Sequence, residues 1–461
     1  MRTTTSLFAL TAAALLAAPA NAQTVLASAE TAPDTTAAMT DTVAAPAAKK
    51  ASLVKPITIQ NMRPVDQRGI NIFEAPKEAG VPFTGFKLDF GAAFTQQYQG
   101  LSHENTAVLD PDGDGVSQNR LMTIGQGFNL ATANLYVNAQ LAPGIRVALS
   151  TYLSSRHHNE TWVKDGYLLI DGSPIDHPTL NKVMEYVTIR AGHMELNYGD
   201  GHFRRSDNGN AMYNPFVGNL ILDAFTTEIG GEVYVRSNGF MGMVGITDGV
   251  NKGDVTNPQR RRPGYYGKLG VDRQLSDDVR VRLTGSTYQV SKTPSATLFA
   301  GDRAGSRYYM VLDNSTATTS AQYTSGLLNP GLRNKLVAYQ LNPFIQFKGV
   351  ELFGVIERAE GRASGETENR EWTQYAIDGI YRFLDDQLYV GARYNTVEGE
   401  LQGVTPKVGA DRVAFAGGWF ITPSILLKGE YVTQKYNDFP TTDIRNGGKF
   451  DGFVVEGVVA F

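Results

Sequence analysis

The chain ends in Phe453-Val-Val-Glu-Gly-Val-Val-Ala-Phe461, where large apolar residues alternate with small or polar ones and the last residue is aromatic. Successive side chains of a β-strand point to opposite faces, so this period of two predicts a strand with one apolar face. The same alternation recurs in many short segments from about Phe86 onward. The terminal stretch therefore belongs to a long series of two-sided strands.

The segment from Ile145 to Ser154 shows both faces of such a strand. One face carries Ile145, Val147, Leu149, Thr151 and Leu153, and the other carries Arg146, Ala148, Ser150, Tyr152 and Ser154. The segments Val279–Thr287 and Ile425–Gln434 also separate an apolar face from a charged one. A charge that faces lipid costs about 2–4 kcal/mol at the bilayer midplane, so in a membrane the charged faces must line an interior.

From Phe86 to Phe461 the alternation predicts about sixteen strands, joined in turn by short and long connections. The short ones are Leu141–Gly144, Ser237–Gly239, Leu275–Asp278, Lys348–Gly349, Leu384–Gln387 and Thr422–Ser424. The long polar ones lie near residues 100–120, 158–182, 198–225, 251–263, 292–334, 361–370 and 437–448. This asymmetry is typical of bacterial barrels, in which the short turns are periplasmic and the long loops extracellular.

We therefore predict an all-β fold in which residues 86–461 form a transmembrane antiparallel β-barrel of about sixteen strands. A barrel of that size is too wide for its own side chains to fill, which predicts a water-filled lumen. The alternatives are a secreted β-sandwich or β-solenoid, but neither requires short and long connections to alternate so regularly.

The residues before the barrel fall into three parts. Residues 1–22 have a basic start at Arg2, an apolar stretch and an A-x-A site at Ala20–Ala22, which predicts a cleaved signal peptide. Residues 23–52 are rich in Ala, Thr and Pro and predict a flexible periplasmic segment. Residues 53–85 contain several large apolar residues, so they either dock on or in the barrel or serve as a disordered spacer.

The composition excludes several classes of protein. Forty-two Lys and Arg stand against forty-six Asp and Glu, so no basic field suggests a nucleic-acid partner. The absence of cysteine excludes a lipoprotein and a disulfide scaffold. Forty-eight Gly, 21 Tyr and 22 Phe suit a barrel with aromatic girdles. We find no G-x-S-x-G elbow or serine–histidine constellation and expect no enzyme activity and no redox or nucleotide cofactor.

The segment from Arg190 to Arg205 reads Arg-Ala-Gly-His-Met-Glu-Leu-Asn-Tyr-Gly-Asp-Gly-His-Phe-Arg-Arg. It resembles the strand-and-loop motif of outer-membrane porins of the alginate-export and phosphate-selective type. The matching residues are Arg190, Gly192, Glu195, Leu196, Tyr198 and Gly199, with Arg204 or Arg205 at the later basic position. His193 stands where the motif has an arginine, which removes a permanent positive charge. The resemblance implies a substrate channel but identifies no solute.

The next segment, Ser206–Phe225, contains the apolar run Leu220-Ile-Leu222, which is too hydrophobic for a solvated loop. We expect this loop to fold into the lumen and to narrow it. A pore constriction would then be formed by Arg190, His193, Arg204 and Arg205, and its arginines would favour anions. Alternatively, Arg204 and Arg205 pair with Asp200, Asp207 or Asp223 and only hold the loop in place.

Three other motifs carry weaker signals. Asp110, Asp112 and Asp114 have the spacing of a calcium loop, but position twelve is Leu121, so only weak Ca²⁺ binding or a plain polar turn is expected. His157 and His158 are adjacent and would point to opposite faces of a strand. The run Arg260–Arg262 is either solvated or contacts lipopolysaccharide phosphate.

The sequence predicts a porin in the outer membrane of a Gram-negative-type bacterium, through which small hydrophilic solutes diffuse passively. Anions are among the candidate solutes, but the sequence does not identify the solute. Its expected partners are outer-membrane lipids and lipopolysaccharide and the barrel-assembly machinery that reads the terminal strand. A homotrimer and a monomer both suit a porin of this size, and the sequence does not decide between them. The competing interpretations are a surface adhesin or anchoring barrel with a plugged lumen and, less favoured, an outer-membrane hydrolase.

Overall fold

The computed structural model describes residues 62–75, 77, 83–129, 131–155, 161–251, 253, 255–256, 258–301, 306–318 and 324–461. The predicted leader at 1–22, the segment at 23–52 and the beginning of the segment at 53–85 lie outside these residues. The same holds for His157 and His158. What the sequence predicts for these parts therefore stays a prediction.

The described residues form one large sheet with short helices in its connections. The strands are β1 (Lys87–Glu104), β2 (Gly127–Phe128), β3 (Thr132–Ala142), β4 (Ile145–Ser154), β5 (Trp162–Ile170), β6 (Val187–Glu195), β7 (Thr227–Ser237), β8 (Phe240–Thr247), β9 (Gly264–Ser276), β10 (Val279–Val290), β11 (Lys335–Phe347), β12 (Val350–Arg362), β13 (Arg370–Phe383), β14 (Leu388–Gly399), β15 (Val408–Thr422), β16 (Ile425–Asn437) and β17 (Lys449–Ala460). The helices are η1 (Gln67–Gly69), α1 (Pro178–Met184), η3 (Gly201–Arg204) and η4 (Pro258–Arg260). Within these residues no helix has the length and apolar character needed to span a bilayer.

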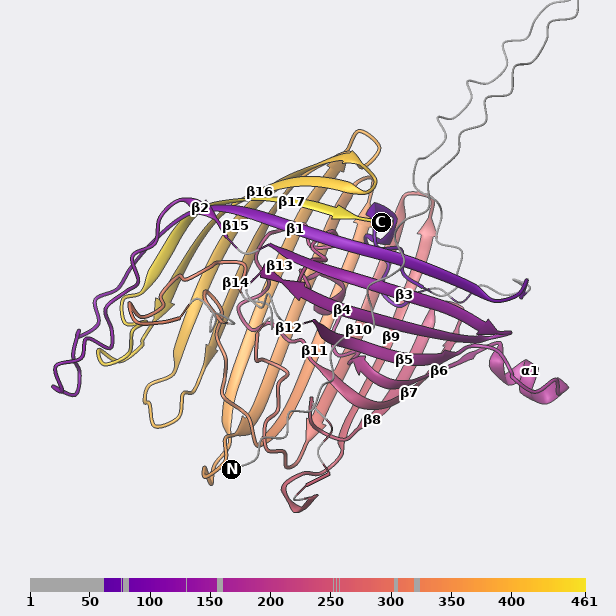
Figure 1. The fold of residues 1–461 in the computed structure, drawn as a ribbon, viewed down its shortest axis with the longest axis horizontal. Coiled ribbons are helices and arrows are strands. Elements are labelled where there is room, and N and C mark those ends of the chain that lie inside the picture. Colours follow the sequence, from indigo (N-terminus) through magenta and orange to yellow (C-terminus); the bar gives the residue numbers. More distant parts are fainter. Residues whose placement is uncertain are drawn as a thin grey trace, which may run out of the picture. The chain divides into compact units, whose positions relative to one another are not determined.

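The sheet closes into a barrel (Figure 1). β1 pairs with β17 on one side and with β3 on the other, and every further strand pairs antiparallel with its neighbour in sequence. β2 has two residues and pairs with β1 beyond the point where β3 ends. The ring itself therefore has sixteen strands, which confirms the predicted fold class.

The two faces of the strands differ as the alternation predicts. Arg146 of β4, Arg282 of β10 and Lys428 of β16 are buried on the inside. On the outside, apolar side chains such as Leu269 and Phe415 remain largely exposed, and they recur on strand after strand. A soluble protein rarely exposes so large an apolar surface, whereas a barrel in lipid requires it. The strands are accordingly membrane-spanning.

The two ends of the barrel differ in their connections. At one end the turns are short: Asn238 and Gly239, between β7 and β8, have φ of 48° and 78°. Positive φ at both central residues is typical of the two-residue type I′ hairpin turn. The other end carries the long connections, including 196–226 and 291–334. We call these the short-turn end and the loop end.

The long loop expected at residues 158–182 is interrupted by a strand. Residues Trp162–Ile170 form β5, and α1 follows in a longer connection at the short-turn end. Lys164 and Asp165 interrupt the alternation within β5, and both are buried. The strand therefore lacks the regular period that marks the others.

The C-terminal strand completes the ring. Phe461 N donates to Ala92 O at 3.0 Å, and Ala92 N donates to Phe461 O at 2.9 Å. Phe453 and Val455 are each 40% exposed on the outer face, as the alternation requires. The last residues of the chain thus join the first strand of the barrel.

Segments from outside the strands fold into the lumen. Residues 62–75 lie near the short-turn end, where Gln67 N donates to Pro423 O. The loop after β6 buries Phe216 and Ile221 completely, and Leu328 from the connection after β10 donates its N–H to Ile221 O. These segments supply the side chains that a wide barrel cannot supply from its own wall. The lumen is narrower than the strand number alone predicts.

Candidate functional site

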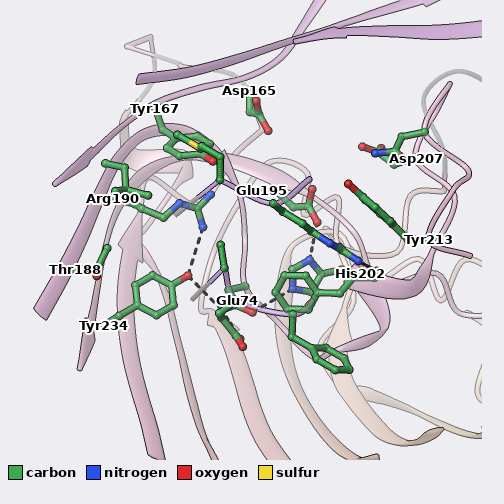
Figure 2. Close-up of a pocket in the computed structure, with 18 of the residues that line it drawn as sticks. Glu74, Asp165, Tyr167, Thr188, Arg190, Glu195, His202, Asp207, Tyr213 and Tyr234 are labelled. Carbon is green, nitrogen blue, oxygen red and sulfur yellow. Dashed lines mark hydrogen bonds and ion pairs between the residues drawn. The ribbon is translucent and has the colours of Figure 1, made fainter. Parts of the chain in front are cut away.

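A cavity of about 240 Å³ remains between the lumen segments and the wall formed by β5, β6 and β7 (Figure 2). The wall contributes Lys164, Asp165, Tyr167, Leu169, Thr188, Arg190, Glu195, Tyr234 and Arg236. Residues 62–75 contribute Met62, Arg63, Phe73, Glu74 and Ala75, and the loop after β6 contributes Asn197, His202, Phe203, Arg205, Asp207, Asn210 and Tyr213. Charged and aromatic side chains thus dominate its lining.

A β-bulge places Lys164 in this cavity. Ser150 of β4 pairs with Asp165, but the next residue, Thr151, pairs with Val163, so Lys164 is an extra residue in β5. A bulge redirects side chains without ending the strand. As a result the two neighbouring charged residues are both turned inward.

Lys164 joins the wall to the lumen loop. Its Nζ lies 2.6 Å from Asp207 and 2.7 Å from Glu195, but 3.8 Å from Asp165. Glu195 also lies 2.6 Å from His202 Nδ1. Burial lowers the pKa of the His202 imidazole, against the opposite influence of Glu195. The cluster fixes the start of the lumen loop beside the cavity.

Arg190 occupies the opposite side of the cavity. Its guanidinium carbon lies 4.2 Å from the centre of the Tyr167 ring, and its Nη1 donates to Glu232 and, at 3.3 Å, to Tyr234 Oη. Figure 2 shows the hydrogen bond between Arg190 and Tyr234 as a dashed line. Stacking on tyrosine and pairing with carboxylate hold the guanidinium in one orientation.

The segment 62–75 forms part of the cavity wall and is held by buried charges. Glu74 lies 3.1 Å from Lys268 and 2.7 Å from Arg282, and Asn197 Nδ2 donates to it at 3.0 Å. Burial raises the pKa of the Glu74 carboxyl, but Lys268 and Arg282 outweigh burial and hold the pKa well below its usual value. The carboxylate therefore stays charged at neutral pH.

The structure places Arg204 and Arg205 in buried ion pairs. Arg204 Nη2 lies 3.2 Å from Glu351 of β12, away from the cavity. Arg205 lines the cavity, but its guanidinium lies 2.6 Å from Asp223 and 3.4 Å from Asp207. Both charges are therefore balanced by neighbouring carboxylates.

The pairs differ in part from those considered from the sequence. Asp207 and Asp223 do pair with Arg205. Asp200 instead lies 2.6 Å from Lys268 and 2.8 Å from Arg282, on the barrel wall. The loop is anchored to the wall as well as to itself.

His193 does not share a face with Arg190. In the ladder between β6 and β7, Arg190 is opposite the buried Glu232, whereas His193 is opposite Ile229, which is 41% exposed on the outer face. Directly paired residues of an antiparallel ladder lie on the same face. His193 is accordingly not among the cavity-lining residues of β6, which are Thr188, Arg190 and Glu195.

The three aspartates of the predicted calcium loop come together between β1 and β3. Carboxylate oxygens of Asp110, Asp112 and Asp114 lie within 4.8 Å of one another. Asp110 accepts from the N–H groups of Gly113 and Gly115. The cluster has the donor type that Ca²⁺ prefers, without the bidentate glutamate of a strong site. Calcium binding there stays a prediction.

The basic run lies at the loop end. Arg261 lies 3.1 Å from Asp248, and Arg260 and Arg262 are exposed. Arg262 N donates to Lys292 O, which brings a further lysine to the same rim.

Several cavity residues were not predicted from the sequence. Lys164 and Asp165 were missed because a β-bulge turns both of them inward, and a prediction from strict alternation does not allow for a bulge. Glu74 lies far from the wall residues in sequence, and only the fold of 62–75 brings it to them. The conspicuous acidic–basic neighbours Lys164-Asp165 inside an apolar strand were the one available signal.

No protein-family model matches this chain, and no curated protein matches it. Among solved structures, an anion-selective porin from Comamonas acidovorans superposes with a TM-score of 0.50 at 11% identity, covering 82% of this chain and 100% of that one. OmpT, an outer membrane protein of Vibrio cholerae, gives 0.48 at 10% identity and covers 82% and 100%. OccK2 of Pseudomonas aeruginosa gives 0.40 at 11% identity, covering 81% and 98%. The first likeness shows the barrel fold.

Proposed function

We propose that this protein is a porin-type channel in the outer membrane of a Gram-negative-type bacterium. Small hydrophilic solutes diffuse passively along the cavity beside β5, β6 and β7. The observation that carries this proposal is a charged, hollow interior inside a barrel whose outer face is apolar. Such an interior binds water and polar solutes, and the outer face keeps the barrel in lipid.

The segment 62–75 is proposed to be a plug at the periplasmic side. Its position near the short-turn end supports this role, because short turns are periplasmic in bacterial barrels. It also covers part of the cavity through Arg63, Phe73 and Glu74. The predicted flexible segment 23–52 would then precede the plug in the periplasm.

The narrowing is proposed to lie at Arg190 and Arg205, which both line the cavity. Arg204 would act only through the loop, since Glu351 holds it away from the cavity. Anion preference of the kind expected from unpaired arginines is weakened, because Glu232 and Asp223 lie against the two guanidiniums.

A second candidate is an anchoring barrel whose loops bind a partner and whose lumen stays closed. It is favoured by the number of buried side chains that the lumen segments place between the walls, such as Phe216, Ile221 and Tyr308. In that case the cavity is a packing defect filled with water. The polar lining and the many buried charges at the cavity favour the channel.

Conductance across a planar bilayer tests the proposal. Purified protein should give discrete current steps in about 1 M potassium chloride. In a salt gradient, the variant Arg205→Gln should shift the reversal potential toward the value of a cation-selective channel. Glu371→Gln, on the outer face, serves as the matched control. A protein that inserts but conducts no current is an anchor. An unchanged reversal potential in Arg205→Gln removes Arg205 from the narrowing.

The proposed partners follow from the outer surface. Outward glycines such as Gly267 and Gly285 leave a hollow of about 970 Å³ on the outer face of β8 to β13. In a homotrimer a second copy covers this hollow, whereas lipid chains fill it in a monomer. Arg260 and Arg262 at the loop end suit the phosphates of lipopolysaccharide, and the strand ending at Phe461 suits recognition by the barrel-assembly machinery.

A further inference from the structure

Buried polar atoms without a hydrogen-bond partner among the described residues border the cavity. Asp165 Oδ1 is one such acceptor, and Arg190 Nε and Arg236 Nε are such donors. Nearly all buried polar groups in folded proteins are hydrogen-bonded, so these atoms mark positions for water or a polar ligand. The three residues come from β5, β6 and β7, and all of them line the cavity.

The acceptor is the carboxylate of Asp165, and the neighbouring Lys164 pairs more closely with other carboxylates. Asp165 is 6% exposed, and Lys164 Nζ is 3.8 Å from it. The same Nζ is 2.6 Å from Asp207 and 2.7 Å from Glu195. Lys164 therefore balances those two carboxylates first, and Asp165 keeps one oxygen, Oδ1, without a hydrogen-bond donor among the described residues.

The donors belong to guanidiniums that are held in place. Arg190 is stacked on Tyr167 and paired through Nη1 with Glu232, and its Nε has no acceptor among the described residues. Arg236 Nη1 donates to Ala75 O at 2.6 Å, and its guanidinium carbon lies 5.0 Å from the Tyr234 ring. Rigidly held donors bind a carboxylate at a smaller entropic cost than mobile ones.

The spacing between the acceptor at Asp165 and the donor at Arg190 indicates the kind of ligand. Asp165 and Tyr167 are two residues apart on β5, about 7 Å along a strand, and Arg190 lies over Tyr167. Figure 2 shows Asp165, Tyr167 and Arg190 around the same part of the pocket. A molecule with an ammonium and a carboxylate on one carbon spans such a gap with one charge-assisted hydrogen bond at each end.

We propose that the cavity is a subsite for small zwitterionic solutes of the α-amino acid class, with the ammonium at Asp165 and the carboxylate at Arg190. The proposal rests on the proposed channel function and names its preferred solute. The cavity volume of about 240 Å³ suits small members of that class. A simple anion meets Asp165, Glu195 and Asp207 there, and a simple cation meets the arginines, so neither is favoured along the whole cavity.

Swelling of proteoliposomes measures the solute preference. The rate with L-serine at pH 7.4 is compared with the rate for erythritol, a neutral solute of similar size, and for lactate, an anion. Wild-type protein should pass serine faster than both. Asp165→Asn and Arg190→Gln should each lower the serine-to-erythritol ratio by about tenfold, the effect of losing one charge-assisted hydrogen bond. Glu371→Gln on the outer face should leave the ratio unchanged.

Each outcome decides a separate claim. Folding of every variant is checked by the slower migration of unheated barrel on SDS gels, and either folded variant is sufficient. A wild-type ratio of one, or a ratio retained in a folded variant, overturns the zwitterion subsite while the channel stands. Vesicles that pass none of the three solutes overturn the channel itself.

Discussion

At the scale of single residues, buried ion pairs connect the lumen loop to the wall. Lys428 of β16 is fully buried, donates to the carbonyl oxygens of Ala211, Asn214 and Phe216, and lies 2.7 Å from Glu456. One ammonium thus serves three backbone acceptors and one carboxylate. Removing it leaves three buried carbonyl groups without this donor and leaves Glu456 with the more distant Arg307, at 3.5 Å, which is far more costly than losing an exposed pair.

Lys428→Met is therefore expected to lower the free energy of unfolding by about 3–5 kcal/mol. Urea unfolding in lipid, followed by tryptophan fluorescence, measures the change. Lys348→Met is the matched control, because the Lys348 side chain is 63% exposed and lies 3.7 Å from Asp278, a pair worth at most about 1 kcal/mol. Equal losses in the two variants would contradict the role of Lys428 in holding the loop.

The residue scale also marks a limit of sequence analysis. Arg190 and Arg205 stand out because they are basic and lie in a distinctive segment, and both reach the cavity. Their acidic partners are Glu232 and Asp223. These pairs could not be assigned from the sequence, because it does not show which carboxylate lies next to which arginine in the folded barrel. The charge balance of the cavity therefore appears only in the structure.

At the scale of elements, regular alternation made most strands predictable, but the bulge in β5 prevented the prediction of that strand. β4, β10 and β16 follow the period of two, and their inward faces are those that the pattern assigned. β5 breaks the period at Lys164 and was placed in a loop. The run Leu220–Leu222 indicated a lumen loop because its apolar side chains need burial, and Ile221 and Leu222 are fully buried.

Glu74 gives the proposed plug a defined pH dependence. Its pKa is lowered below the usual 4.5 because Lys268 and Arg282 outweigh burial, so this contact contributes fully above about pH 4.5 and is lost only as the pH falls through the lowered pKa. In the wild type, residues 62–75 should therefore resist protease from pH 8 to pH 5. Glu74→Gln should expose these residues to protease and raise the conductance at pH 7.

The control for this experiment is Glu360→Gln, which removes an exposed carboxylate at the other end of the barrel. It should leave both conductance and protease sensitivity at the wild-type level. A Glu74→Gln variant that conducts and resists protease like the wild type would show that residues 62–75 do not act as a plug.

At the scale of the whole molecule, barrel closure followed from local patterns but lumen filling did not. Strand number, short turns and the terminal Phe461 are properties of neighbouring residues, and they predicted a closed ring. The paths of 62–75 and 200–225 depend on contacts such as Glu74 with Lys268, between residues far apart in sequence. No local periodicity records such contacts, so the sequence predicted a more open lumen than the structure has.

The proposed channel depends on the insertion of the whole barrel in a bilayer. A pair of substitutions on the outer face tests this insertion. Ile377 lies near the middle of β13 and is 54% exposed on the outer face. Ile377→Arg should cost about 2–4 kcal/mol of stability in lipid, because a charge would face hydrocarbon. Gln289→Arg, on the outward face of β10 close to the loop end, should cost about 0–1 kcal/mol, because it lies near the interface. Urea unfolding in vesicles measures both, and equal costs would mean that the apolar outer face does not meet lipid.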